Sequence, residues 1–138
     1  MKSLRLMFAF AAGALLAPLA VTLVASPAPD YLSMERESVL TRIVDLLEAR
    51  RASGTADLDE IAKARLKLHT FRRDAATTVS GKIRQQELIV ELLTKQYQLQ
   101  LTRWDAGLAD ELVLLRSADS VLAARQLLTE LKARESKD

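Results

Sequence analysis

The sequence predicts an all-α protein, either an antiparallel four-helix up-down bundle or a set of long helical hairpins, behind an N-terminal signal or anchor segment. All three prolines lie within the first 29 residues, so the rest of the chain lacks the residue that most strongly breaks helices. Apolar residues then recur three and four positions apart in four successive segments, which is the spacing of one helical face. A chain of 138 residues has room for one such domain, over residues 30–138.

Residues 1–29 have the composition of an export signal. Lys2 and Arg5 precede an uncharged, mostly apolar stretch over residues 6–25, and a basic start before an apolar stretch is typical of secretory signals. About 20 apolar residues can also span a bilayer, so an uncleaved membrane anchor is the alternative to a cleaved signal. Both alternatives predict an exported protein that is periplasmic or associated with the envelope. The chain contains no cysteine, which leaves no disulfide to stabilise the fold.

The first two predicted helices meet at a turn over residues 50–57. Asp57 with Glu60 three positions later resembles a capping box and marks the start of the second helix. The apolar face of the first helix is formed by Leu40, Ile43, Val44 and Leu47, and the seam of the second by Ile61, Ala64, Leu68, Phe71, Ala75 and Thr78.

The last two predicted helices meet at a second turn, over residues 103–110. The third helix covers residues 83–104, and the fourth ends where the polar C-terminal tail begins. The apolar side of the third comprises Ile89, Val90, Leu93, Tyr97 and Trp104, and the seam of the fourth comprises Leu114, Ser117, Val121, Ala124, Leu128 and Leu131.

The boundary between the second and third helices is predicted as a turn at Gly81. The surrounding T-T-V-S-G-K, residues 77–82, contains β-branched residues, and glycine costs about 1 kcal/mol inside a helix. The alternative is one continuous helix over residues 57–103, roughly 70 Å long, which would give three helices in all. Burial favours four helices, because a long single helix covers less apolar surface than a closed bundle.

The two turns repeat a phrase at an interval of 53 residues. R-R-A-S-G-T-A-D at 50–57 and R-W-D-A-G-L-A-D at 103–110 share Arg, Gly, Ala and Asp at equivalent positions. Gly54 and Gly107 predict left-handed residues that end a helix, and the aspartate three residues later predicts the start of the next. The interpretation is a repeated helical hairpin with both turns at one end, and internal duplication and shared turn chemistry both explain it.

Charge argues against a nucleic-acid partner. Without Lys2 and Arg5, 18 of the 20 basic residues are left, against 18 acidic residues that all follow the signal segment. Proteins that bind nucleic acid through phosphates carry a basic surplus. The single basic cluster follows acidic residues within one predicted helix, which is typical of a solvated face; it contains Lys63, Arg65, Lys67, Arg72 and Arg73.

Residues suited to catalysis or to metal binding are scarce. His69 is the only histidine, and no serine lies in a G-x-S-x-G turn. The carboxylates of Asp57, Asp59 and Glu60 lack the loop glycine of a calcium site, so they are interpreted as capping residues. The sequence therefore predicts a half-buried or surface imidazole, no enzyme, no cofactor and no metal site.

The segment that begins at Arg103, R-W-D-A-G-L-A-D-E-L-V-L-L-R-S-A-D-S-V-L-A-A-R, resembles the TolC-type outer-membrane efflux proteins. The resemblance implies the periplasmic tip of a helical hairpin, where the channel of that family is gated and an adaptor protein docks. No alternating segment long enough for a transmembrane strand occurs in the chain, so the resemblance extends to a hairpin module and not to a channel. Its matched positions are Arg103, Trp104, Gly107, Leu108, Ala109, Leu112, Leu115 and Arg125.

Three hypotheses for the function stay open. The leading one is a non-enzymatic envelope protein whose hairpin end contacts other helical envelope proteins, or a second copy, in an efflux or secretion assembly. Its expected contact residues are Arg103, Trp104, Asp105 and Leu108, where Trp104 is either a core residue beside the turn or an exposed anchor. The alternatives are a small periplasmic stress- or metal-responsive helical protein and an accessory or inhibitor protein of an enzyme.

Overall fold

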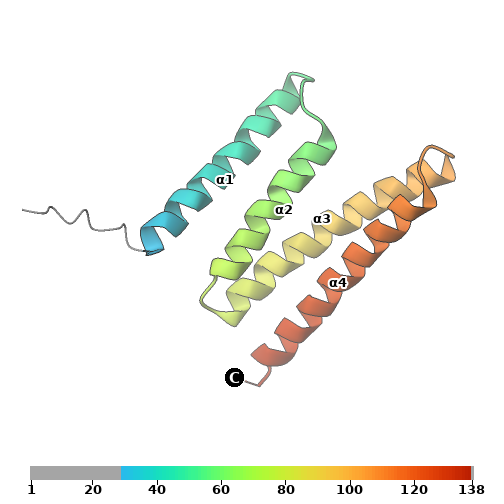
Figure 1. The fold of residues 1–138 in the computed structure, drawn as a ribbon. Helices are drawn as coiled ribbons and strands as arrows, with labels where there is room; N and C mark the ends of the chain where they lie inside the picture. Colours follow the sequence, from blue (N-terminus) through green and yellow to red (C-terminus); the bar gives the residue numbers. More distant parts are fainter. Residues whose placement is uncertain (1–28, 138) are drawn as a thin grey trace, which may run out of the picture.

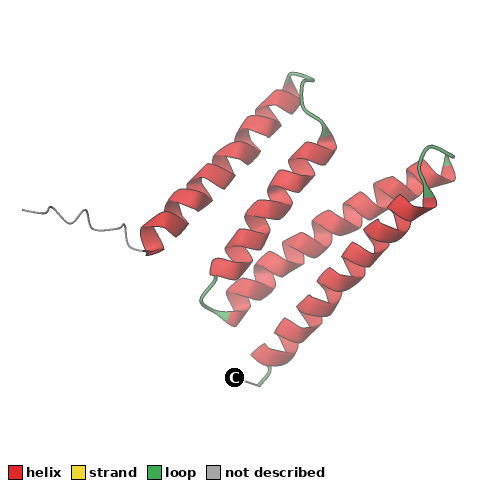
Figure 2. Ribbon diagram, in the orientation of Figure 1, coloured by secondary structure: helices red, strands yellow, loops and turns green. Residues whose placement is uncertain are grey.

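The computed structural model describes residues 29–137, which form four helices. These are α1 (Pro29–Ala52), α2 (Leu58–Ala75), α3 (Val79–Asp105) and α4 (Glu111–Glu135). Figure 1 shows them in chain order, each reversing the direction of the one before. No strand occurs in residues 29–137 (Figure 2). The all-α class and the four helices are therefore confirmed, whereas the predicted signal or anchor lies, apart from Pro29, outside the described residues.

The four helices form an open row of two hairpins. Within the described part of the chain, α1 contacts α2, α2 contacts α3 and α3 contacts α4, and no other pair of helices is in contact. In Figure 1, α2 and α3 lie in the middle and α1 and α4 at the outer edges. The predicted hairpins are formed, but α1 and α4 do not meet to close a bundle. Each outer helix consequently has a single neighbour among the four described helices.

The first hairpin has a small core between α1 and α2. Leu40, Val44 and Leu68 form a buried cluster, against which Ala64 and Phe71 pack. These residues are the ones that the three-four spacing placed on the facing sides of the first two helices. Leu47 and Ile61, which are closer in sequence to the turn, are also buried.

Ile43 is an exception to the predicted core of the first helix. Its side chain is 41% exposed, although it belongs to the same apolar pattern as Leu40 and Val44. The reason is geometric: a helix with one neighbour has only one narrow face covered, and Ile43 lies beside that face. Periodicity identifies apolar sides of a helix, but the number of neighbours determines how much of each side is buried.

Two ion pairs join the helices of the first hairpin. Arg65 Nη2 lies 2.6 Å from Glu48 Oε1, and Arg72 Nε lies 2.8 Å from Glu37 Oε1. All four side chains are partly exposed, so each pair contributes at most about 1 kcal/mol. These arginines belong to the basic cluster of the second predicted helix and serve as contacts between helices.

Gln86 connects the two hairpins. Only 1% of its surface is exposed. Its Nε2 donates a hydrogen bond to the carbonyl oxygen of Ala124 on α4 at 2.8 Å, and its Oε1 accepts one from Arg73 Nη1 on α2 at 2.9 Å. The side chain therefore bonds to both neighbours of α3. A glutamine does not belong to the apolar pattern of a helix, so the sequence does not predict its burial. Ile83, three residues earlier, is also buried.

The break between α2 and α3 is confirmed, but Gly81 is not its turn residue. The chain reverses at residues 76–78, and Gly81 lies in the first turn of α3 without a positive φ. Thr78 is the N-cap, and its Oγ1 accepts a hydrogen bond from the Gly81 N–H at 3.1 Å. A Cβ at Gly81 would stand 2.9 Å from that oxygen. Gly81 therefore lies beneath the cap of α3 and not where the chain reverses, so the prediction of a turn at Gly81 is wrong.

Candidate functional site

The turn at residues 50–57 ends α1 with a left-handed glycine, as predicted. Gly54 has a φ of +75°. Its N–H donates to the carbonyl oxygen of Arg51 at 2.8 Å, and the Thr55 N–H donates to that of Arg50 at 2.9 Å. This pair of hydrogen bonds is the Schellman motif, which satisfies carbonyl groups that the end of the helix leaves without partners.

The turn at residues 103–110 repeats this geometry at the end of α3. Gly107 has a φ of +71°, and its N–H donates to the carbonyl oxygen of Trp104 at 2.8 Å. The Leu108 N–H donates to that of Arg103 at 2.7 Å. The interval of 53 residues also separates the last residues of α1 and α3 and the first residues of α2 and α4. The structural turns predicted at Gly54 and Gly107 are therefore confirmed.

Both turns pass into the next helix through an aspartate. The carboxylate of Asp57 accepts a hydrogen bond from the Asp59 N–H at 3.3 Å, and that of Asp110 accepts one from the Leu112 N–H at 2.8 Å. Asp57 is thus confirmed as an N-cap. A return bond from Glu60, as in a full capping box, is not formed among the described residues.

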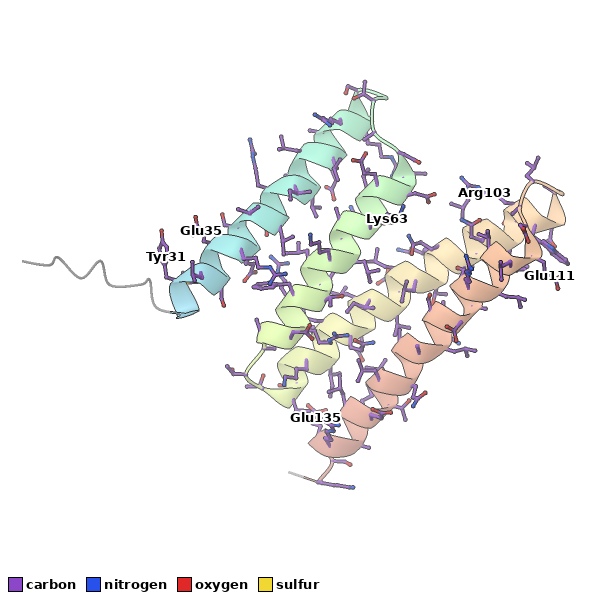
Figure 3. The ribbon with its side chains drawn as sticks, in the orientation of Figure 1. Tyr31, Glu35, Lys63, Arg103, Glu111 and Glu135 are labelled. Atoms are coloured by element: carbon purple, nitrogen blue, oxygen red, sulfur yellow. The ribbon has the colours of Figure 1, made fainter. Side chains whose placement is uncertain are left out.

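The predicted contact residues lie together at the free end of the second hairpin. Trp104 is 44% exposed and Leu108 is 79% exposed, so the tryptophan is not a core residue. Arg103 and Asp105 are exposed as well, and within residues 29–137 neither forms an ion pair. Figure 3 shows Arg103 on α3 and Glu111 on α4 at this end of the molecule. The structure brings together all four residues that the sequence singled out.

Exposed apolar side chains continue from the turn onto α4. Leu112 and Leu115, two positions that match the efflux-protein segment, are 50% and 57% exposed. We call Arg103, Trp104, Asp105, Leu108 and Leu112 the tip surface. It combines aromatic and aliphatic area with one charge of each sign, and aromatic residues and arginine are the types most enriched where proteins bind each other.

Shallow grooves run along the sides of both hairpins. One of about 490 Å³ between α3 and α4 is lined by Tyr97, Leu101 and Leu122 among others. Another of about 600 Å³, between α1 and α2, includes Arg36 and Lys67 and is open to solvent. Arg36 lies over the Phe71 ring, 5.0 Å from its centroid.

His69 is half-buried, as expected, and its Nδ1 lies 2.9 Å from Gln85 Oε1 on α3. Among the described residues, no three or more histidine and acidic side chains gather into a group able to hold a metal ion. The hydrogen bond and charge of Lys95 lower the pKa of Glu91 on the exposed side of α3. That pair is a surface contact one helical turn apart.

Within residues 29–137, none of the helices has the length and apolar character needed to cross a membrane. The predicted anchor over residues 6–25 falls outside that range. No protein-family model matches the chain, and no curated protein or solved structure is significantly similar to it.

Proposed function

We propose that this chain is a non-enzymatic, exported helical-hairpin module that contacts a helical protein of the bacterial-type envelope through its tip surface. The single observation that carries the proposal is the exposure of Trp104 and Leu108 at the free end of the α3–α4 hairpin. Burying a tryptophan and a leucine at an interface supplies the hydrophobic area of a binding hot spot. Because Trp104 and Leu108 are both partly exposed, their apolar surface is accessible to a partner.

The charges at the tip surface support recognition of a specific partner. Arg103 offers a planar set of donors suited to a carboxylate, and Asp105 offers an acceptor. Neither charge is used in an ion pair among the described residues. The expected partner is therefore an α-helical protein that presents apolar residues flanked by an acid and a base.

The location and assembly are part of the same proposal. The basic start and apolar stretch of residues 1–29 support export, and the resemblance of the segment from Arg103 to efflux-protein tips supports an efflux or secretion assembly. A reporter enzyme that is active only outside the cytoplasm, fused after the last residue of the full chain, should be active. An inactive reporter on a stably produced fusion would contradict export.

Partner contact is tested by photo-cross-linking from the tip surface in intact cells. A photoreactive residue at Leu108 of the full chain should capture a helical envelope protein, identified by mass spectrometry. Changing Arg103 and Trp104 together to Ala should weaken this contact by about 2 kcal/mol, or roughly 30-fold in affinity. Circular dichroism of the double variant should stay that of a helical protein, because both side chains are exposed.

The first hairpin provides a matched control. Arg50 and Arg51 occupy the positions equivalent to Arg103 and Trp104, and changing both to Ala should leave capture unchanged. A photoreactive residue at Leu58, 48% exposed near the other turn, should not capture the same protein. Equal capture from Leu58, undiminished capture by the tip double variant, or loss of helical structure in that variant would each contradict the proposal.

A further inference from the structure

A second apolar stripe lies on α1, on a side that its packing against α2 does not use. Leu32, Val39, Ile43 and Leu46 are between 41% and 54% exposed. The residues that α1 buries are different ones, Leu40, Val44 and Leu47. We call the four exposed residues the outer stripe. Single exposed apolar residues are common on protein surfaces, whereas apolar residues that gather along one face are typical of interaction surfaces.

Three of the four residues of the outer stripe are evenly spaced along α1. Leu32, Val39 and Leu46 follow one another at intervals of seven residues, which differ from two full turns of an α-helix by only about 20°. They therefore lie in line over about 21 Å of α1, with Ile43 beside them. Leu32 and Leu46 are each seven residues from Val39, so these three positions are symmetric about Val39 along the helix axis.

That symmetry fits a second copy of the chain. When two identical helices pair antiparallel about a two-fold axis at Val39, Val39 meets its own counterpart and Leu32 of each copy meets Leu46 of the other. α1 is an outer helix with α2 as its one neighbour among the described residues. The side chains of a second α1 can approach the outer stripe without displacing α2.

The charges beside the outer stripe are complementary in the same arrangement. Glu35 and Arg42 are seven residues apart and therefore lie on the same flank of the stripe. Figure 3 shows Glu35 on the side of α1 away from α2. In the antiparallel pair, Glu35 stands within about one residue, or about 1.5 Å along the axis, of Arg42 of the second copy. Neither residue forms an ion pair within residues 29–137. In a parallel pair, Glu35 would instead lie at the same height along the axis as Glu35 of the second copy, and Arg42 at the same height as Arg42.

We propose that the outer stripe is the interface of a homodimer in which two copies of α1 pair antiparallel about Val39, with Glu35 of each copy opposite Arg42 of the other. This inference goes beyond the proposed function and uses the opposite edge of the molecule from the tip surface. It leaves both tip surfaces of the dimer free for partners.

The absence of cysteine from the sequence makes a direct test possible. In the full chain, Val39→Cys should form a disulfide-linked dimer on mild oxidation, because a disulfide needs Cα atoms about 4.4 to 6.8 Å apart and only a residue at the two-fold axis meets itself. Leu32→Cys alone and Leu46→Cys alone should not, since each is about 10 Å along the axis from the centre. Co-expressed, those two variants should cross-link to each other.

Leu122→Cys is the matched control, because Leu122 on α4 is also an exposed leucine-sized apolar residue at 64%. It should give at least about tenfold less dimer than Val39→Cys. Three results would overturn the homodimer. They are equal dimer yields of Val39→Cys and Leu122→Cys, a disulfide between two copies of Leu32→Cys as in a parallel pair, and cross-linking of Val39→Cys to a protein of another mass.

The ion pairs give a second measurement that leaves the outer stripe intact. Adding Glu35→Arg to the Val39→Cys chain should lower the dimer yield several-fold, by placing two arginines together. Adding Arg42→Glu as well should restore it, because the pair is then reversed in sign. A dimer yield that does not fall with Glu35→Arg, or that stays low when Arg42→Glu is added, would overturn the proposed register. The native mass of the unmodified chain should be that of a dimer.

Discussion

In the turn at residues 50–57, the hydroxyl groups of Ser53 and Thr55 both donate to the carbonyl oxygen of Arg50, at 2.8 and 3.0 Å. The equivalent positions in the turn at residues 103–110 are Ala106 and Leu108, which cannot do so. The backbone nevertheless has the same left-handed glycine and the same two hydrogen bonds in both turns. The turn at residues 50–57 is thus bridged by its own polar side chains, whereas the turn at residues 103–110 exposes apolar side chains to solvent.

The difference separates residues that shape a turn from residues that give it a function. The positions shared by the two turns are Arg, Gly, Ala and Asp, and two of these, the glycine and the aspartate, end one helix and begin the next. The tip surface comes almost entirely from positions that differ. In this chain, residues shared by the two turns shape the backbone, and residues that differ between them form the surface proposed for binding.

The largest expected effect concerns whether the two hairpins are independent repeats. Gln86→Leu should lower the free energy of unfolding by about 2 to 3 kcal/mol, because it removes both hydrogen bonds of the buried Gln86 side chain, the one from the charged Arg73 and the one to the Ala124 carbonyl. Urea denaturation followed by circular dichroism measures it. Gln98→Leu on the exposed side of α3 should change stability little. An equally small effect of Gln86→Leu would mean that the hairpins do not depend on each other.

The equivalence of the two glycines is the next test. Gly54→Val and Gly107→Val should each destabilise the chain by about 1 to 2 kcal/mol, since both sites have positive φ and a β-branched residue is strained there. A Cβ at either site would meet no atom within 4 Å, so strain in the backbone is the whole cause. Asn at the same sites should cost less. An unchanged unfolding midpoint for one of the two valine variants would show that the turns are not alike.

The aspartate caps should show a smaller, graded difference. Asp110→Ala should cost about 1 kcal/mol and Asp57→Ala about half of that, because the cap of α4 has a hydrogen bond of 2.8 Å and that of α2 one of 3.3 Å. Thermal unfolding of the two variants side by side measures the order. The reverse order would mean that hydrogen-bond length does not account for the difference between the turns.

The smallest effect distinguishes Gly81 from the two turn glycines. Gly81→Ala should be nearly neutral alone, because the gain in helix propensity is offset by displacement of the Thr78 hydroxyl. In a Thr78→Ala background the same change should stabilise by about 0.5 kcal/mol or more, since the hydroxyl is gone. Additive effects in this double-mutant cycle would show that the cap and the glycine act separately.

Local features of this molecule follow from the sequence because they depend on residues a few positions apart. The three-four spacing predicts α2 and α4 and their buried residues, such as Leu68 and Val121. Gly54 and Gly107 predict the left-handed helix ends, and Asp57 predicts a cap. The exposed position of Trp104 is different, because an aromatic residue at the edge of an apolar side suits the core and the surface equally.

Other features depend on which helices become neighbours, and only the tertiary structure decides that. Gln86 is buried because its polar groups find partners on α2 and α4. Ile43 is exposed because α2 is the one neighbour of α1 among residues 29–137. The sequence by itself determined four helices and two equivalent turns, through hydrogen bonds and backbone preferences within single segments. The open row, with an apolar stripe on its outer helix and Trp104 at its tip, was decided by packing between segments far apart in the chain, where burial depends on contacts that no local pattern specifies.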